Sequence, residues 1–309
     1  VSRGLSNNFY QMWLAVALFG IGGPLISIGA PKASSLWKSQ KNRAISMGIL
    51  FTGPMFGGII SLSTMNSILM PFLNSDWKLV YYFYSLVPLL SGFIWLIIVN
   101  KRPILNKQKD TILNISKSVS EFKLIIIKKR FLIILILGTC TMFLVHGLGG
   151  WLPKILFSKG ISISLSSLLA TIPIVIGIVS ALTIPRFTNN DTRIKILTLL
   201  FINAAFSLLL LQSNNLIIFI IGLFFLGMST GSLIAIILNH LSETKDISYN
   251  NIGIAGGLFF SIIEIGGVLG PFFIGLIYDL YSNFNIALSL YALLMFIMIF
   301  PLYILKNKI

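Results

Sequence analysis

The sequence predicts an all-α integral membrane protein, on three observations: its composition, the length of its apolar runs and the placement of its basic residues. Of the 309 residues, 56% are hydrophobic and 10% are charged, whereas a soluble domain has roughly a quarter of its residues charged. The apolar residues fall into runs near the length of about 20 that spans a bilayer core. They show no strand-like alternation, so helices are the form that satisfies every backbone group in lipid.

Nine such runs predict nine transmembrane helices: 12–31, 45–70, 79–99, 131–151, 163–185, 194–212, 215–238, 252–278 and 284–305. A Lys-rich polar stretch separates the third run from the fourth and is expected to be a cytoplasmic connector, part of it lying on the membrane surface. The predicted organisation is therefore three spans in 1–99, a connector in 100–130 and six spans in 131–309.

The basic residues lie mainly on one side of the predicted spans. When the loops are numbered in order, 19 Lys and Arg fall on one side and 4 on the other. This positive-inside pattern places the C-terminus in the cytoplasm of a multi-pass protein of the cell (plasma or inner) membrane. The net charge of +15 is thus explained by anionic lipid headgroups, and no nucleic-acid partner is expected.

The second and eighth runs share a pattern of small residues around an internal Gly-Pro. A helix face without bulky side chains allows close helix packing, and a proline bends the helix, so these residues are expected to act in packing or as hinges. They are Gly48, Gly53, Pro54, Gly57 and Gly58 in the second run, and Gly266, Gly267, Gly270, Pro271 and Gly275 in the eighth. The first and seventh runs also correspond, which implies a repeat of six helices. The first repeat then lacks its opening three helices, so the chain is expected to be N-terminally incomplete.

With these motifs the sequence resembles the major facilitator superfamily over nearly its whole length. Gly53-Pro54-x-x-Gly57-Gly58 is similar to the fifth-helix motif of the family, and Gly270-Pro271-x-x-x-Gly275 is similar to its eleventh-helix ending. Trp151-Leu152-Pro153 resembles the seventh helix of the cyanate-permease-like and other anion-porter branches. The resemblance implies a two-half helical bundle in which the nine spans are the fourth to twelfth of twelve. It also implies a transporter, expected to be monomeric, with a small-molecule substrate.

The charged cytoplasmic motif of the family has a partial counterpart between the fifth and sixth runs. Arg186, Asp191 and Arg193 supply its acid and bases, but the glycine and the adjacent Asp-Arg are missing.

His146 and Glu264 are the two clearly ionisable side chains well inside predicted spans. A charge at mid-bilayer costs roughly 2.5 kcal/mol or more, so such a group usually faces a cavity or a partner. Glu264 is expected either to carry a coupling proton or to hold a helix contact as a neutral acid. His146 is expected either to bind an anion or relay a proton, or to be a neutral side chain bonded to a backbone carbonyl. The two are expected to be isolated, and His240 is expected in a cytoplasmic loop without a specific role.

Polar residues in the first and seventh runs form a further candidate pathway. Ser229, Thr230 and Asn239 lie in or next to the seventh run, and Ser27 lies in the first. The resemblance implies that these two helices line the central cavity, but Ser and Thr in helices also bond their own backbone.

The leading hypothesis is a secondary transporter, by symport or antiport, that moves a small solute, expected to be an anion, by alternating access. The alternative within this fold is a proton-coupled exporter of drugs or metabolites. Outside it stand a non-transporting truncated remnant and a membrane-embedded enzyme. The enzyme is disfavoured because there is no His-Glu-x-x-His run or clustered acid pair, and with the single Cys140 no metal site or cofactor is expected.

Overall fold

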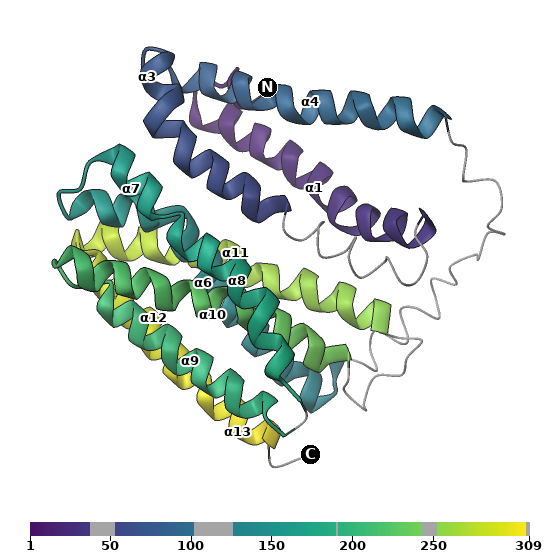
Figure 1. Ribbon diagram of the computed structural model, residues 1–309, viewed down its shortest axis with the longest axis vertical. Coiled ribbons are helices and arrows are strands. Elements are labelled where there is room, and N and C mark those ends of the chain that lie inside the picture. The colour runs from purple at the N-terminus through teal and green to yellow at the C-terminus, as the bar shows by residue number, and fades with distance from the viewer. Residues whose placement is uncertain (38–52, 102–125, 190, 243–251, 307–309) are drawn as a thin grey trace. The chain divides into compact units, whose positions relative to one another are not determined.

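The computed structural model describes the backbone of residues 1–37, 53–101, 126–189, 191–242 and 252–306. It describes the side chains of 1–23, 53–98, 126–189, 191–241 and 255–305. Every regular element in these ranges is a helix. The chain divides into two compact units, Val1–Ile112 and Leu113–Ile309 (Figure 1).

The predicted all-α membrane fold is confirmed. Within the described residues, eight helices are long and apolar enough to cross a membrane, and a ninth, shorter apolar helix covers Phe9–Gly23. Each corresponds to one of the nine predicted runs. The eight are Gly53–Phe72, Trp77–Ile98, Lys129–Ser158, Ile163–Phe187, Arg193–Leu210, Leu216–Leu241, Ala255–Tyr281 and Phe284–Leu305.

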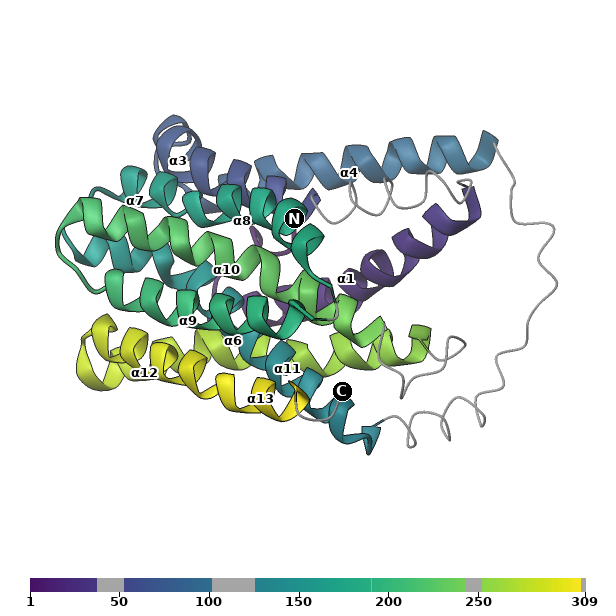
Figure 2. The ribbon, with the colours of Figure 1, turned by 60° about the horizontal axis from the view of Figure 1, so that its bottom comes forward.

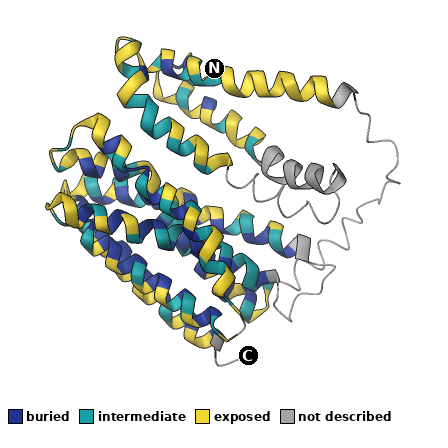
Figure 3. Ribbon diagram, viewed as in Figure 1, coloured by how far each residue is buried: buried dark blue, intermediate teal, exposed yellow. Residues whose placement is uncertain are grey.

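The first unit contains α1 (Phe9–Trp37), the helix Gly53–Phe72 and α4 (Trp77–Lys101). The middle helix passes through one π-helical turn, η1 (Met65–Leu69), before ending in α3 (Met70–Phe72). Thr64 Oγ1 and Tyr84 Oη lie 2.7 Å apart and tie this helix to α4. The C-terminal half of α4, from Leu86 to Ile98, exposes mainly apolar side chains (Figure 3), as a membrane-spanning helix of a small unit does.

The second unit contains six spanning segments. They are α6 (Lys129–Ser158), α7 (Ile163–Leu169) with α8 (Ile172–Thr183) and the 3₁₀ turn η3 (Ile184–Phe187), α9 (Arg193–Leu210), α10 (Leu216–Ser242), α11 (Ile252–Tyr281), and α12 (Phe284–Ile297) with α13 (Ile299–Lys306). The most extensive helix pairing is between α6 and α11. In addition, α10 packs on α8 and α9, and α12 packs on α9 (Figure 2). Buried side chains follow these contacts through the interior of the unit (Figure 3).

Two predicted spans are interrupted at a position that a proline explains. The run 163–185 is divided because α7 ends at Leu169, four residues before Pro173. The run 284–305 is divided because α12 ends at Ile297, four residues before Pro301. A proline has no N–H to donate to the carbonyl four residues earlier and its ring crowds that carbonyl. Pro153 and Pro271, in contrast, lie inside uninterrupted helices.

The C-terminal end of α6 is fastened to the loop between α9 and α10. The Lys159 ammonium donates to the backbone carbonyl of Gln212 at 3.0 Å and to Asn214 Oδ1 at 3.3 Å. Partial burial lowers the pKa of Lys159, because removal from water disfavours the charged form.

The crossing of α8 and α10 depends on glycines. A Cβ at Gly231 would collide with the backbone of Gly177, and a Cβ at Gly227 would lie 2.6 Å from the carbonyl oxygen of Pro173. The Ser180 hydroxyl donates across the crossing to the carbonyls of Gly227 and Met228, at 3.3 and 3.1 Å. Contact between the two backbones therefore holds this pair of helices.

Gly231→Ala should destabilise the protein by about 1–3 kcal/mol, the usual cost of overpacking a tight site. The methyl group has no space unless α8 and α10 separate. The measurement is the thermal unfolding midpoint of purified protein in detergent. Gly256→Ala on α11 is the matched control, because a Cβ there meets nothing within 4 Å. Equal losses in both variants would show that the α8–α10 crossing is not tight.

Candidate functional site

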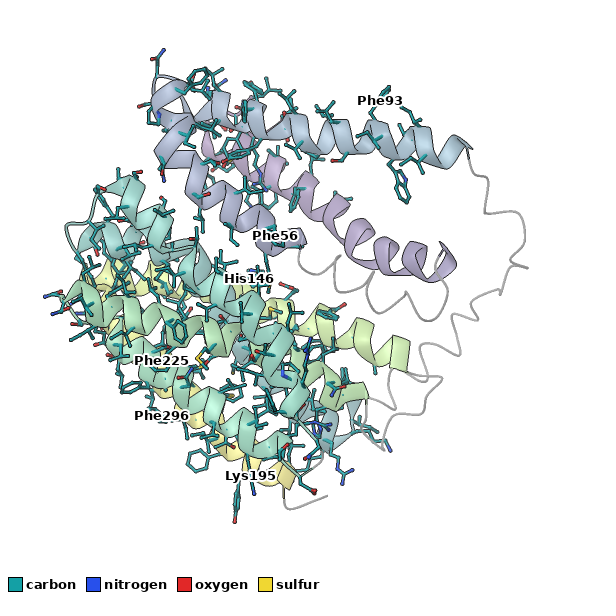
Figure 4. All side chains as sticks on the ribbon, viewed as in Figure 1. Phe56, Phe93, His146, Lys195, Phe225 and Phe296 are labelled. Carbon is teal, nitrogen blue, oxygen red and sulfur yellow. The ribbon has the colours of Figure 1, made fainter. Side chains whose placement is uncertain are left out.

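His146 and Glu264 face one another from α6 and α11. His146 Nε2 lies 3.9 Å from Glu264 Oε2, and the two side chains are 48% and 54% exposed. His146 is labelled on its helix in Figure 4. The expectation that the two are isolated is wrong, since helix packing joins residues 118 positions apart in the sequence. At 3.9 Å the contact is longer than a direct hydrogen bond of about 2.7–3.2 Å, so the two side chains face one another without a formed hydrogen bond.

Close packing of α6 on α11 determines which residues meet. A Cβ at Gly266 would collide with the carbonyl of Thr139, and a Cβ at Gly270 with the carbonyl of Phe143. The two backbones therefore touch at two points one helical turn apart, as small residues permit in membrane bundles. This contact fixes the register of the two helices and brings His146 opposite Glu264.

Gly267 leaves the space that the Glu264 carboxylate occupies. A Cβ at Gly267 would lie 2.6 Å from Glu264 Oε2 and 3.4 Å from His146 Cδ2. Pro271, four residues further on, supplies no N–H to the Gly267 carbonyl. The Glu264 carboxyl group and the His146 imidazole thus both lie beside Gly267.

The indole of Trp151 joins α6 to α11 beyond this pair. Its Nε1–H donates to the carbonyl oxygen of Pro271 at 2.9 Å. Its ring lies over Gly275, where an added Cβ would be 3.1 Å from the nearest ring atom. The Lys154 ammonium lies 4.8 Å from the ring centroid of Trp151 and 5.0 Å from that of Tyr278, a cation–π geometry. This cluster was not predicted from the sequence, although Trp151 and Lys154 at a spacing of three share a helix face.

Some of the polar residues predicted on α10 as a candidate pathway form buried contacts. The Ser229 hydroxyl is fully buried, accepts from Asn203 Nδ2 at 2.7 Å and donates to the carbonyl of Leu200 at 2.9 Å. Both partners belong to α9. Thr230 donates to the carbonyl of Leu226 in its own helix at 3.0 Å, and Asn239 lies half-buried near the end of α10. The side chain of Ser27 lies outside the described residues.

The residues of the charged cytoplasmic motif are not gathered together. Arg186 in η3 and Asp191 are exposed, whereas Arg193 at the start of α9 is buried and its Nη1–H donates to His240 Nδ1 at 3.1 Å. His240 lies in the last turn of α10, not in a loop as expected, and it links that helix to α9.

The glycines of the second run, which were predicted to act in helix packing or as hinges, lie in the first unit. A Cβ at Gly53 or Gly57 meets nothing within 4 Å in the described part of the chain. Pro54 and Gly58 belong to the same helix, Gly53–Phe72, and Gly48 lies outside the described residues. Within those residues, no group of three His, Cys, Asp or Glu side chains is placed to hold a metal ion.

Comparisons with known proteins agree with one another. The profile of the Major Facilitator Superfamily matches residues 2–248. The Hexuronate transporter of Bacillus subtilis (strain 168) is 21% identical over 302 residues, which cover 91% of this chain and 69% of that protein. A bacterial homologue of the human lysosomal transporter Spinster has a similar fold. Its inward-facing unoccupied structure gives a TM-score of 0.65 at 16% identity over 98% of this chain and 77% of that one. The occupied structure gives 0.63 at 17% identity over 98% and 76%.

Ser229→Ala should lower the free energy of unfolding by about 1 kcal/mol, the scale of a hydrogen bond between helices in a membrane. The change leaves Asn203 without its buried side-chain acceptor. Thr230→Val removes a hydroxyl that bonds only its own helix and should have a smaller effect. Unfolding of both variants in mixed micelles with increasing SDS would compare them, and an equal effect would place Ser229 outside the α9–α10 contact.

Proposed function

The chain belongs to the Major Facilitator Superfamily, and from this premise we propose that it carries a small anion across the membrane by alternating access. As a multi-pass member of this family it is a transporter with a small-molecule substrate and not an enzyme. The identity of the solute, the coupling ion and the orientation of the chain are the parts that we propose.

The observation that carries the proposal is the contact between His146 and Glu264. Ionisable groups within membrane spans are costly and mark substrate or ion pathways. Both side chains are half-exposed, so neither is enclosed as a packed structural contact would be. We propose that Glu264 carries the coupling proton and that His146 binds the substrate or relays the proton.

The relative named a hexuronate transporter supports an anionic substrate. It aligns with 91% of this chain at 21% identity, and a hexuronate carries one carboxylate. A protonated imidazole donates a charge-assisted hydrogen bond that a carboxylate accepts readily. We therefore propose small organic anions as the substrate class, with galacturonate as the first compound to test. Among the remaining candidates, Ser27, Thr230 and Asn239 stay proposed substrate contacts.

Alternating access requires parts that move as bodies. We propose that 1–99 and 131–309 belong to different halves of the fold, joined by the connector 100–130, most of which lies outside the described residues. The close α6–α11 and α8–α10 crossings support a second half that moves as one body. The glycines around Pro54 and Pro271 are proposed as the positions where helices flex.

Glu264→Gln should reduce uptake of labelled galacturonate driven by an acid-outside pH gradient to background in proteoliposomes. The amide keeps the shape of the side chain but cannot carry a proton. Exchange of galacturonate across the membrane without a gradient should persist, because exchange needs no net proton movement. Asp279→Asn is the control, since Asp279 is an exposed acid near the end of the same helix.

Undiminished gradient-driven uptake by Glu264→Gln would eliminate Glu264 as the proton carrier. If galacturonate enters neither by gradient nor by exchange, while an acid-outside gradient drives expulsion of lipophilic cations as protons enter, the proton-coupled efflux alternative is favoured.

The basic loops support a cytoplasmic C-terminus in the plasma or inner membrane, and we propose that the chain acts as a monomer. In a Cys140→Ala background, a cysteine at Asp191 should be shielded from an impermeant maleimide applied to intact cells. A cysteine at Ser158, on the opposite side in the proposed topology, should react. Both positions are exposed. If only the cysteine at position 191 reacted, the topology would be the reverse of the proposed one.

A further inference from the structure

Two lysines at the C-terminal end of α6 are held in different ways. The Lys159 ammonium donates to Gln212 and Asn214 of the loop between α9 and α10, so its donors fasten one part of the fold to another. The exposed Lys154 ammonium lies against aromatic rings. In the part of the chain that the structure describes, it has no hydrogen-bond acceptor, and the exposed acid Asp279 makes no ion pair with it. Its three N–H donors are therefore available to a ligand.

Aromatic side chains from three helices hold the Lys154 ammonium in place. It lies 4.8 Å from the ring centroid of Trp151 on α6 and 5.0 Å from that of Tyr278 on α11. The Trp151 ring is fixed by its hydrogen bond to the Pro271 carbonyl. Tyr278 stacks on the buried Phe284 of α12 at 4.1 Å, with 18° between the rings. Because cation–π attraction already orders the lysine side chain, an anion that binds it gives up less conformational entropy.

This aromatic cluster lies on the same side of the α6–α11 pair as His146 and Glu264. On α11, Tyr278 follows Glu264 by nearly four whole helical turns, which places both on one face. On α6, Lys154 follows His146 by eight residues, about 12 Å along the helix axis. Between them, a Cβ added at Gly150 meets nothing within 4 Å. No described side chain therefore covers α6 at Gly150, midway between the lysine and the histidine.

A lysine at the end of a span commonly extends to lipid headgroups. The rings of Trp151 and Tyr278 instead hold the ammonium back over the α6–α11 pair, on the side where His146 and Glu264 are half-exposed. One fixed cation beside aromatic rings matches a small solute that has one carboxylate and an apolar surface, because solute sites combine apolar walls with few polar groups. These observations favour a solute over a headgroup.

We propose that Lys154 is a first binding site for the carboxylate of a small organic anion, such as a sugar acid. The site lies on the outer side in the proposed topology, and the anion passes from it along α6 to His146. Trp151 and Tyr278 are positioning residues that hold the ammonium. An uncharged sugar has no group for the ammonium to pair with and does not bind there. This inference rests on the proposed function as an anion transporter.

The first test measures binding at Lys154 itself. An impermeant sulfonated N-hydroxysuccinimide ester acylates exposed lysine amines, and mass spectrometry reads the rate at each lysine of the protein in proteoliposomes. Galacturonate should slow the acylation of Lys154, with half of the effect near the concentration that half-saturates uptake. Galactose, which is uncharged, should not slow it, and Lys159 should react at the same rate with and without galacturonate.

Equal protection of Lys154 by galactose, or no protection in a protein that transports galacturonate, would overturn the binding site and leave the proposed function intact. A rate that changes with the phosphatidylglycerol content of the liposomes, but not with galacturonate, would overturn it in favour of a lipid headgroup. Absence of both uptake and exchange in the wild-type protein would overturn the proposed function, and this inference with it.

The second test separates the charge of Lys154 from its packing. Lys154→Gln should raise the KM for galacturonate uptake about fivefold, the upper end of what an exposed ion pair contributes, and leave kcat unchanged. Lys154→Arg keeps the positive charge and should keep a KM close to that of the wild type. An unchanged KM in Lys154→Gln, or an equal rise in both variants, would show that the carboxylate does not pair with this cation.

The third test concerns the aromatic ring of Tyr278. Tyr278→Leu removes one of the two rings that hold the ammonium and should raise the KM about twofold, the scale of an exposed cation–π contact, with kcat unchanged. Tyr278→Phe keeps the ring and its stacking on Phe284 and should restore the wild-type KM. Equal values in the two variants would show that the ring does not position Lys154.

Discussion

The close approach of the α6 and α11 backbones is the constraint on which the candidate site depends. Lipid tails are as apolar as leucine, so burying apolar surface between helices in a bilayer adds little stability. Helix association there depends on close van der Waals packing and on hydrogen bonds between helices. Gly266 and Gly270 give that contact by meeting carbonyl groups of α6. Once the backbones touch, the rotation and register of both helices are fixed. A histidine and a glutamate that the sequence separates by more than a hundred residues then face one another.

The bilayer itself explains why so much of the fold could be predicted. A span must be long, apolar and helical, so composition and run length were enough to place nine helices, and the described residues bear them out. The breaks before Pro173 and Pro301 could not be told in advance from the unbroken course through Pro153 and Pro271. A proline removes the same hydrogen bond in each case, and the outcome depends on the neighbouring helices that re-satisfy the freed carbonyl. The orientation of the chain stays a prediction.

The site was predictable one residue at a time. His146 and Glu264 stand out because an ionisable side chain in an apolar run is costly wherever it points. Their pairing could not be predicted, since it arises from the packing register of α6 on α11. The same limit applies to Ser229. A serine in a span is compatible with a substrate contact and with a buried contact, and only the position of Asn203 on α9 distinguishes them. The roles of these residues in transport stay proposals.

Polar groups within the spans of the second unit thus differ in how fully they are engaged. Asn203, Ser229 and the Trp151 indole form short hydrogen bonds, and breaking them costs stability without offering an alternative arrangement. His146 Nε2 and Glu264 Oε2, in contrast, lie 3.9 Å apart, which is close but beyond the length of a hydrogen bond. A helix contact alone would favour the short, buried geometry, because a formed hydrogen bond adds to stability. The open geometry instead suits groups that exchange partners, as a transporter must do each time it loads and releases its solute.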